Sequence, residues 1–231
     1  MKETKLNKNG SYEISTYNSN GKLINQSVHY SDGTLGRYTV YKRDESGKLV
    51  RVYEHNAKGT TKLIKEYDRN ENEIKSSRYV DNKLISYTIT KRDNKGNIIK
   101  STSYNSDGSI ESIDTYEHGR IVRTDSTYNG FLDSYTIYET DCHGKKVRSK
   151  TYSIEYSFVN VTEYNENGQT TKIYNYKYDG SLDSYFVQTH DEIGNSIRAV
   201  YYSPNDEVRS VLEFSPDGRI ERIIEFEGVS D

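Results

Sequence analysis

Leu132–Tyr152, LDSYTIYETDCHGKKVRSKTY, is the stretch that decides the fold, because its pattern occurs four times in the chain. A leucine, a tyrosine, a glycine and a base recur there at fixed offsets. The four columns are Leu35, Leu84, Leu132 and Leu182; Tyr38, Tyr87, Tyr135 and Tyr185; Gly47, Gly96, Gly144 and Gly194; and Arg51, Lys100, Arg148 and Arg198. The nearly constant step between copies, about 48 residues, indicates an internal repeat.

Each copy contains several short strand signals. Segments rich in Tyr, Thr, Ile and Val alternate with polar clusters that end in Gly or Asn, and these turn signals begin at Gly21. Apart from a gap at Ser153–Ser157 they follow at intervals of about a dozen residues, which leaves about eight residues for a strand. Pairs such as Asp32-Gly33 and Asp179-Gly180 accept the positive φ that tight hairpin turns need. The sequence therefore predicts an all-β protein without helices.

The expected architecture is an antiparallel β-meander of about eighteen short strands, with four strands per repeat. We expect one domain over residues 1–231, made of a partial unit 11–32 and the units 33–81, 82–129, 130–179 and 180–228. Because apolar and polar columns fall on both faces of the strands, one extended sheet, rolled or superhelical, fits best. A β-propeller with four or five blades is the alternative, since propeller blades have similar lengths.

Composition limits the classes of function. The net charge is −3, with 32 basic and 35 acidic residues, which argues against a protein held to nucleic acid by phosphate contacts. No apolar run is long enough for a membrane helix, and the N-terminus MKETKLNKNG has no apolar segment typical of a secretory signal. We therefore expect a cytoplasmic protein. The 23 tyrosines, with no tryptophan, predict a thin core in which Tyr does much of the packing.

Three features could carry chemistry, and a structural interpretation is favoured for each. Asp44, Asp93, Asp141 and Asp191 stand three residues before the repeat glycines, where a carboxylate can accept backbone N–H groups of the turn, so turn capping is favoured over a metal site. Cys142-His143 is expected to be an incidental turn pair. Asp133 and Asp183 are expected to be solvated partners of nearby bases rather than an acid–base pair. The sequence thus predicts no catalytic residue, no metal and no cofactor.

The recurring Tyr-(Asn/Asp)-x-x-Gly-x-(Leu/Ile) pattern resembles the YD repeat of Rhs-type bacterial proteins. It occurs at Tyr17–Leu23, at Tyr104–Ile110 and, without its last position, at Tyr164–Gly168. The units also resemble degenerate MORN-like repeats, although the Gly-x-Trp element is missing. The resemblance implies an all-β scaffold that encloses or binds another protein, and it supplies no catalytic residue.

The Tyr column and the base column form the candidate binding surface. In the structural interpretation of these two columns, the tyrosines stack as ladders and the bases pair with acids on a solvent-exposed face of the sheet. Their functional interpretation is a protein-binding surface, because aromatic and Arg side chains are enriched in binding hot spots. We expect a non-catalytic scaffold that binds a protein partner, with an immunity or antitoxin-type role toward a bacterial toxin as the sharpest version. The alternatives are a carbohydrate-binding repeat module and a structural segment of an Rhs-like shell.

Overall fold

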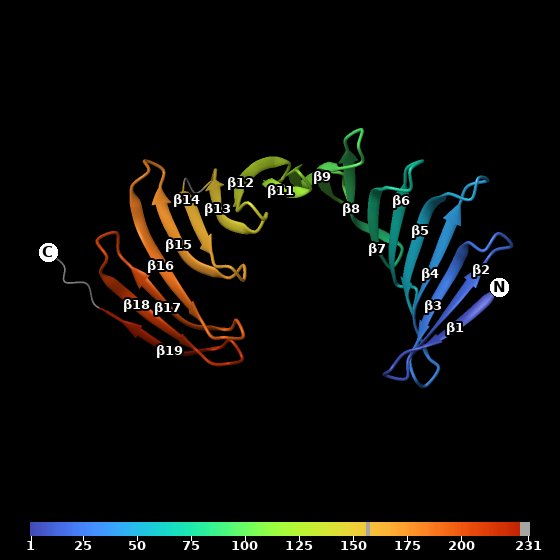
Figure 1. Ribbon diagram of the computed structural model, residues 1–231. Coiled ribbons are helices and arrows are strands. Elements are labelled where there is room, and N and C mark those ends of the chain that lie inside the picture. Colours follow the sequence, from blue (N-terminus) through green and yellow to red (C-terminus); the bar gives the residue numbers. More distant parts are fainter. Residues whose placement is uncertain (156–157, 227–231) are drawn as a thin grey trace. The chain divides into compact units, whose positions relative to one another are not determined.

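The computed structural model describes residues 1–155 and 158–226, and in this part of the chain all regular structure is β-strand (Figure 1). The strands are β1 (Lys2–Leu6), β2 (Tyr12–Tyr17), β3 (Leu23–His29), β4 (Leu35–Arg43), β5 (Leu49–Asn56), β6 (Thr61–Tyr67), β7 (Glu73–Val80), β8 (Lys83–Arg92), β9 (Ile98–Asn105), β10 (Ile110–Glu117), β11 (Arg120–Tyr128), β12 (Phe131–Thr140), β13 (Lys146–Ser153), β14 (Phe158–Tyr164), β15 (Thr170–Lys177), β16 (Leu182–His190), β17 (Ser196–Tyr202), β18 (Val208–Phe214) and β19 (Ile220–Glu225).

The strands form one open sheet in which neighbours in the chain pair antiparallel, from β1–β2 through to β18–β19. This confirms the predicted meander. A propeller needs a separate sheet for every blade, so the single sheet excludes that alternative. The sequence predicted about eighteen strands, and the described residues form nineteen. The prediction missed β1, whose residues KETKL are all exposed and carry little of the apolar alternation that marks a strand.

The chain divides into two compact units, Met1–Ile113 and Asp114–Asp231. The first contains β1 to β9 and the second β11 to β19, while β10 lies across the boundary. Each unit therefore has its own set of strands and its own two sheet faces.

Backbone capping explains why the turns occur where they do. In the turn from Asp44 to Lys48, the Asp44 N–H donates to the Lys48 carbonyl at 2.9 Å, and the Gly47 N–H donates to the Asp44 carbonyl at 3.0 Å. The Asp44 Oδ1 accepts the Lys48 N–H at 3.0 Å, and Gly47 takes a φ of +83°. This arrangement satisfies the polar groups that the tight reversal would otherwise leave unpaired, and a glycine accepts the positive φ without strain.

The same cap recurs at about half the period of the sequence repeat. At eight positions of the described chain with this spacing, a side-chain oxygen accepts the backbone N–H four residues on: Asn18, Asp44, Asp68, Asp93, Asp141, Asn165, Asp191 and Ser215. Ser203 makes a ninth bond of this kind, from the Glu207 N–H, in a turn at the other end of the strands. The spacing is doubled between Asp93 and Asp141, where a tight turn at His118 and Gly119 takes the intermediate place. The structural unit is therefore one hairpin, and the longer sequence repeat is a pair of hairpins.

Both faces of the sheet are mixed, as the sequence predicted. We call the face that carries Tyr38 and Tyr87 in the first unit, or Tyr135 and Tyr185 in the second, the Tyr face. The strand registers place the buried Val161 and Val211 on the Tyr face of the second unit. They place the buried Val52 and Ala199 on the opposite faces of their units.

The core is thin. Val52, Val161, Ala199 and Val211 are the buried hydrophobic residues of the described part of the chain. The accessible surface is 15669 Å². Two separate compact globules, each of half the mass, would together expose about 12,900 Å² by the usual scaling of surface with mass. The accessible surface exceeds this value by about a fifth, which indicates sheet units exposed to solvent on both faces rather than globules with a solvent-free core.

Candidate functional site

The tyrosines of the repeat column each stack on an aromatic ring directly opposite on the next strand. Tyr38 pairs with His55, Tyr87 with Tyr104, Tyr135 with Tyr152 and Tyr185 with Tyr202, both in register and in ring contact. The ring centroids of these pairs lie 4.4, 4.6, 4.6 and 4.7 Å apart, and the ring planes are within 14° of parallel. Such pairs add stability beyond the area that they bury.

Three of these tyrosines are also covered on their other ring face. The ammonium of Lys75 lies 5.0 Å from the ring centroid of Tyr87, and the guanidinium of Arg123 lies 4.4 Å from that of Tyr135. Tyr185 has Tyr174 on its other side, with 5.7 Å between the centroids. In each case the second neighbour comes from the strand on the opposite side of the tyrosine's own strand. These three tyrosines therefore present ring edges and hydroxyl groups to solvent instead of open ring faces.

The predicted ladders exist, but their composition differs from the expectation. The four column tyrosines were expected to stack on one another, and they do not, because four strands separate one repeat from the next. They stack instead on a second aromatic column, His55, Tyr104, Tyr152 and Tyr202, that the sequence analysis left out. Its signal was available, since each member follows its tyrosine at one constant offset in the sequence.

The base column lies on the Tyr face, near the capped turns. Arg51, Arg148 and Arg198 each stand in register with a glutamate on the following strand, namely Glu66, Glu163 and Glu213. In the first pair the guanidinium is 3.3 Å from the Glu66 carboxylate. On the preceding strand Lys100 stands in register with Lys91, as Arg51 does with Lys42. The expected pairing of bases with acids thus holds for the three arginines at the level of register.

One column tyrosine has an unusual proton affinity. The Tyr185 hydroxyl donates a hydrogen bond to the Asp206 Oδ1 at 2.7 Å. This bond, helped by partial desolvation, raises the pKa of Tyr185 to about 12. The phenol therefore stays protonated across the physiological range, where it serves as a hydrogen-bond donor.

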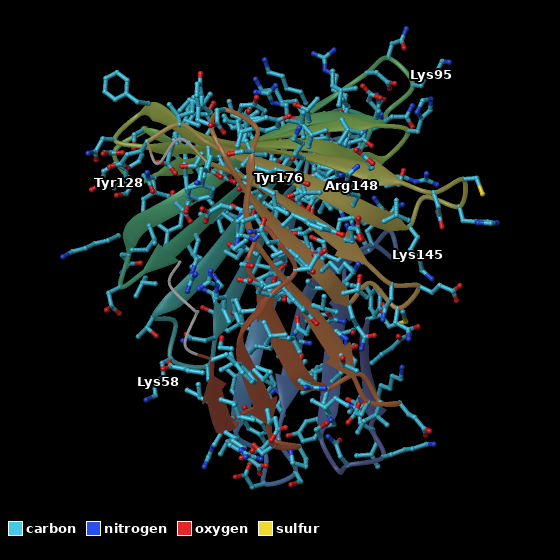
Figure 2. The ribbon with its side chains drawn as sticks, turned by 90° about the vertical axis from the view of Figure 1, so that its left-hand side faces the viewer. Lys58, Lys95, Tyr128, Lys145, Arg148 and Tyr176 are labelled. Atoms are coloured by element: carbon cyan, nitrogen blue, oxygen red, sulfur yellow. The ribbon has the colours of Figure 1, made fainter. Side chains whose placement is uncertain are left out.

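A hollow on the Tyr face of the second unit brings the base column beside an aromatic residue. It has a volume of about 360 Å³, and its lining includes Arg148, Lys150, Val161 and Tyr176. Figure 2 labels Arg148 and Tyr176 over the strands of this unit. Tyr176 was missed by the column analysis. It belongs to an aromatic row with Tyr174, and the i, i+2 spacing of the two on β15 was the available signal.

The eight column residues of the candidate surface do not converge on one pocket. In the first unit Tyr38, Tyr87, Arg51 and Lys100 share a face, with the tyrosines toward one end of the strands and the bases toward the other. In the second unit Tyr135, Tyr185, Arg148 and Arg198 repeat this arrangement. Such a broad, repeated display fits contact with an extended surface better than enclosure of a small molecule.

The aspartate column caps its turns, as predicted. In Asp141 the Oδ1 accepts the backbone N–H groups of His143 at 2.9 Å and Lys145 at 2.8 Å. The bond from Lys145 is the chief cause of the lowered pKa of this carboxyl. The pKa values of Asp44, Asp93 and Asp191 are lowered as well. No group of three or more His, Cys, Asp or Glu in the described residues is arranged to hold a metal ion.

Cys142 and His143 approach each other more closely than the sequence analysis expected. The Cys142 Sγ lies 3.3 Å from the His143 Nδ1, because both residues occupy the tip of the Asp141 turn, where adjacent side chains can lean together. The thiol is exposed. An activated nucleophile needs a base that is itself held in place by a third group, and an exposed pair on a turn does not by itself meet this requirement.

Asp133 and Asp183 belong to β12 and β16, four strands apart in the second unit. At the usual strand spacing they are separated by about 19 Å, beyond the reach of a carboxylate pair that cleaves glycosidic bonds. The Asp183 carboxylate lies 3.7 Å from the Lys177 ammonium, which agrees with the predicted role as a partner of a base.

None of the residues that the structure describes belongs to a helix of the length and apolarity that crossing a membrane requires. No protein-family model matches the chain, and no curated protein matches it either.

Several solved structures share an all-β likeness with the chain. A crystal structure of TcdB2-TccC3-TEV matches with 11% identity and a TM-score of 0.33, over 96% of this chain and 15% of that one. A structure of TcdB2-TccC3-Cdc42 matches with 14% identity and a TM-score of 0.35, over 93% of this chain and 14% of that one. A porin-like protein from Bacteroides uniformis matches with 11% identity and a TM-score of 0.34, over 96% and 91%. This chain thus spans about one seventh of the first two structures.

Proposed function

We propose that this chain is a non-catalytic β-repeat scaffold that binds a protein partner through its Tyr face, and that the partner is a bacterial toxin. In this proposal it acts in the cytoplasm as an immunity or antitoxin-type protein. The Tyr and base columns, Tyr38, Tyr87, Tyr135, Tyr185, Arg51, Lys100, Arg148 and Arg198, form the contact surface.

The observation that supports this proposal most is the closed stacking of the column tyrosines. Tyr87, Tyr135 and Tyr185 have a neighbour on both ring faces, so each side chain is held in one orientation before any partner arrives. Rigid tyrosines contribute contact area at a low cost in conformational entropy. Exposed arginines at the other end of the same face add donors for carboxylates and carbonyls of a partner.

The same geometry disfavours the carbohydrate-binding alternative. A sugar ring stacks on an open aromatic face, and these three tyrosines offer only their edges and hydroxyl groups. The hydroxyl of Tyr185 is already bonded to Asp206. Protein partners, by contrast, are bound through ring edges and hydroxyl groups as readily as through ring faces.

Affinity capture followed by binding measurements tests the proposal. The purified chain is used to capture proteins from its source cell, and the affinity of each purified candidate is measured for the wild type and for Arg51→Ala, Arg148→Ala and Arg198→Ala. We expect at least one of these variants to weaken binding about thirtyfold, the loss typical of an arginine hot spot. Arg78→Ala is the matched control, because Arg78 is an exposed arginine on the opposite face of the first unit.

Equal losses for Arg51→Ala and Arg78→Ala would contradict the assignment of the Tyr face. Strong binding of the chain to sugars on a glycan array, weakened by changes in the Tyr column, would replace the proposal with the carbohydrate-binding alternative. Inhibition of the captured partner's toxic activity by the wild-type chain, and its loss in the arginine variants, is the result expected for an immunity protein.

A further inference from the structure

A second exposed surface lies in the second unit, at the end of the strands opposite the Asp141 turn. Phe131 and Tyr128, on either side of the β11–β12 turn, are 79% and 71% exposed. Leu132 is 41% exposed, and Ile154, in the segment that follows β13, is 51% exposed. These four side chains line a common hollow of about 350 Å³. Figure 2 shows Tyr128 and Lys145 at opposite ends of the strands, so this surface is separate from the Asp141 turn.

The repeat supplies an internal control for these exposed apolar residues. At the position of Phe131 the other three copies carry Thr34, Lys83 and Ser181. At the position of Ile154 they carry Ala57, Ser106 and Pro204. The β7–β8 turn, which like the β11–β12 turn has two successive residues at positive φ, is therefore built with Lys83 in place of Phe131. Exposure of Phe131 and Ile154 to water has an unfavourable free energy that the other copies avoid, which points to a use other than folding.

Charge identifies the kind of occupant. Among the described residues, the charged side chains that line the hollow are those of Asp133 and Glu155, and no base lines it. The backbone joins the two turns here, because the Ile154 N–H donates to the Asp133 carbonyl at 2.8 Å. An apolar hollow with two carboxylates at its margin is complementary to an apolar side chain that has Lys or Arg beside it.

The same two carboxylates disfavour other occupants. A second copy of this chain, docked symmetrically on the hollow, would bring Asp133 and Glu155 of the two copies together, and like charges repel. An anionic membrane surface and a nucleic acid would be repelled for the same reason.

We propose that the hollow formed by Tyr128, Phe131, Leu132 and Ile154 binds a basic, apolar segment of a partner polypeptide, with Asp133 and Glu155 facing its Lys or Arg side chains. This inference rests on the proposed function as a protein-binding scaffold and adds a second contact surface with a stated partner chemistry. Phe131 is the apolar anchor of that surface.

Two synthetic peptides test this inference. One has a Leu-Phe centre flanked by two lysines on each side, and the other has glutamates in place of the lysines. Each is titrated into the full-length ¹⁵N-labelled chain while amide chemical shifts are recorded. We expect the basic peptide to shift the amides of residues 128–133 and 154–155, and the acidic peptide to bind at least tenfold more weakly.

Variants of the chain then separate the contributions. Phe131→Ser is expected to weaken the basic peptide about thirtyfold, as for an aromatic anchor. Asp133→Asn is expected to weaken it about threefold, as for an exposed charge pair. Ile193→Ser is the matched control, because Ile193 is 86% exposed in the Asp191 turn, at the other end of the strands, and its loss should leave binding unchanged. If Phe131→Ser has a lowered melting temperature, Phe131→Lys replaces it as the test variant. Its lysine is the residue that another copy of the repeat carries at this position, Lys83.

Three outcomes would overturn the inference: no binding of the basic peptide, equal affinity for both peptides, or unchanged affinity in Phe131→Ser. Self-association of the wild type in sedimentation velocity, abolished by Phe131→Ser, would assign the hollow to a second copy and overturn it as well. A captured partner that needs Arg148 but tolerates Phe131→Ser would overturn this inference and leave the proposed function in place.

Discussion

Gly144 shows how one backbone position limits what a residue can be. It has a φ of +82° in the turn after β12, in the left-handed region that a β-branched residue adopts only with strain. We expect Gly144→Val to lower the free energy of unfolding by about 2 kcal/mol. Arg148→Ala, which removes an exposed base, should change it much less. Urea denaturation of the two variants measures the difference.

A second glycine, Gly47, separates the effect of backbone strain at positive φ from the effect of a steric clash with Arg120. A Cβ on Gly144 would lie 1.7 Å from the Cζ of Arg120, so this side chain has to move, whereas a Cβ on Gly47 would meet no atom within 4 Å. Gly47 has nearly the same φ, +83°. Gly47→Val should therefore show the backbone strain alone, and any further loss in Gly144→Val reports the displacement of Arg120. If both valine variants were as stable as Arg148→Ala, the turn assignment would be wrong.

Tyr185 offers a prediction about pH. Its pKa in the folded state is about 12, against 10.0 for an ordinary tyrosine, because its hydroxyl donates to Asp206. A raised pKa in the folded state means that this interaction stabilises the fold fully below pH 10 and that its effect is lost as the pH rises toward 12. Titration of the Tyr185 ring resonance by NMR should give a midpoint near 12 that falls clearly in Asp206→Asn. An unchanged midpoint in that variant would contradict the assigned cause.

At the scale of the element, the hairpin with its cap is the unit that the chain repeats. The nine caps found in the described residues use three residue types, Asp, Asn and Ser, for one task, which is to accept the backbone N–H four residues on. Asn18 and Asn165 do this without a charge. The carboxylate is therefore one of several acceptors that the turn can use, and a capping role predicts that Asp and Asn are interchangeable.

Asp141 is the position at which to test that interchange. Asp141→Asn should keep the bonds from His143 and Lys145, and its melting temperature at pH 7 should stay close to that of the wild type. Asp141→Ala removes the acceptor and should lower the melting temperature by a few degrees. Differential scanning calorimetry of the two variants checks this. If both lost the same amount, the charge rather than the cap would be the stabilising feature.

The loss of stability at acid pH follows from the same carboxyl groups. The pKa of Asp141 is lowered from 3.8 in the folded chain, so its contribution is present above pH 3.8 and is lost as the pH falls through the lower folded value. Asp44, Asp93 and Asp191 have the same direction of shift. The melting temperature of the wild type should therefore drop below about pH 4, and the drop should be shallower in Asp141→Asn. An identical pH profile in the variant would argue against this linkage.

At the scale of the whole molecule, each strand of the described residues is hydrogen-bonded to the strands next to it in the chain, so stability is distributed locally. Val161 is 2% exposed and lies in the middle of β14. We expect Val161→Ala to cost about 2 kcal/mol and to raise amide hydrogen exchange in β13, β14 and β15. Exchange in the first unit should hardly change. A uniform increase along the chain would instead indicate that the two units unfold as one cooperative body.

Particular residues show where the sequence analysis succeeded and where it did not. The Gly47, Gly96, Gly144 and Gly194 column and the aspartates before it predicted the turns correctly, because turn chemistry is local. The strand β1 was missed because pairing with β2, rather than its own apolar pattern, makes it a strand. The ring partners of the tyrosines were missed because a partner on the neighbouring strand depends on the strand register. Whether the Tyr and base columns bind a partner stays a prediction.

What the sequence by itself determined is the all-β class, the spacing of the hairpins and the capping of the turns at Asp44, Asp93, Asp141 and Asp191, because these depend on residues within a few positions of one another. Only the tertiary structure decided that Tyr87, Tyr135 and Tyr185 each have a neighbour on both ring faces. It alone also decided that Phe131 and Ile154, from two different turns, line one hollow. The physical reason is that register and twist place side chains from separate strands against each other, and no local pattern contains that information.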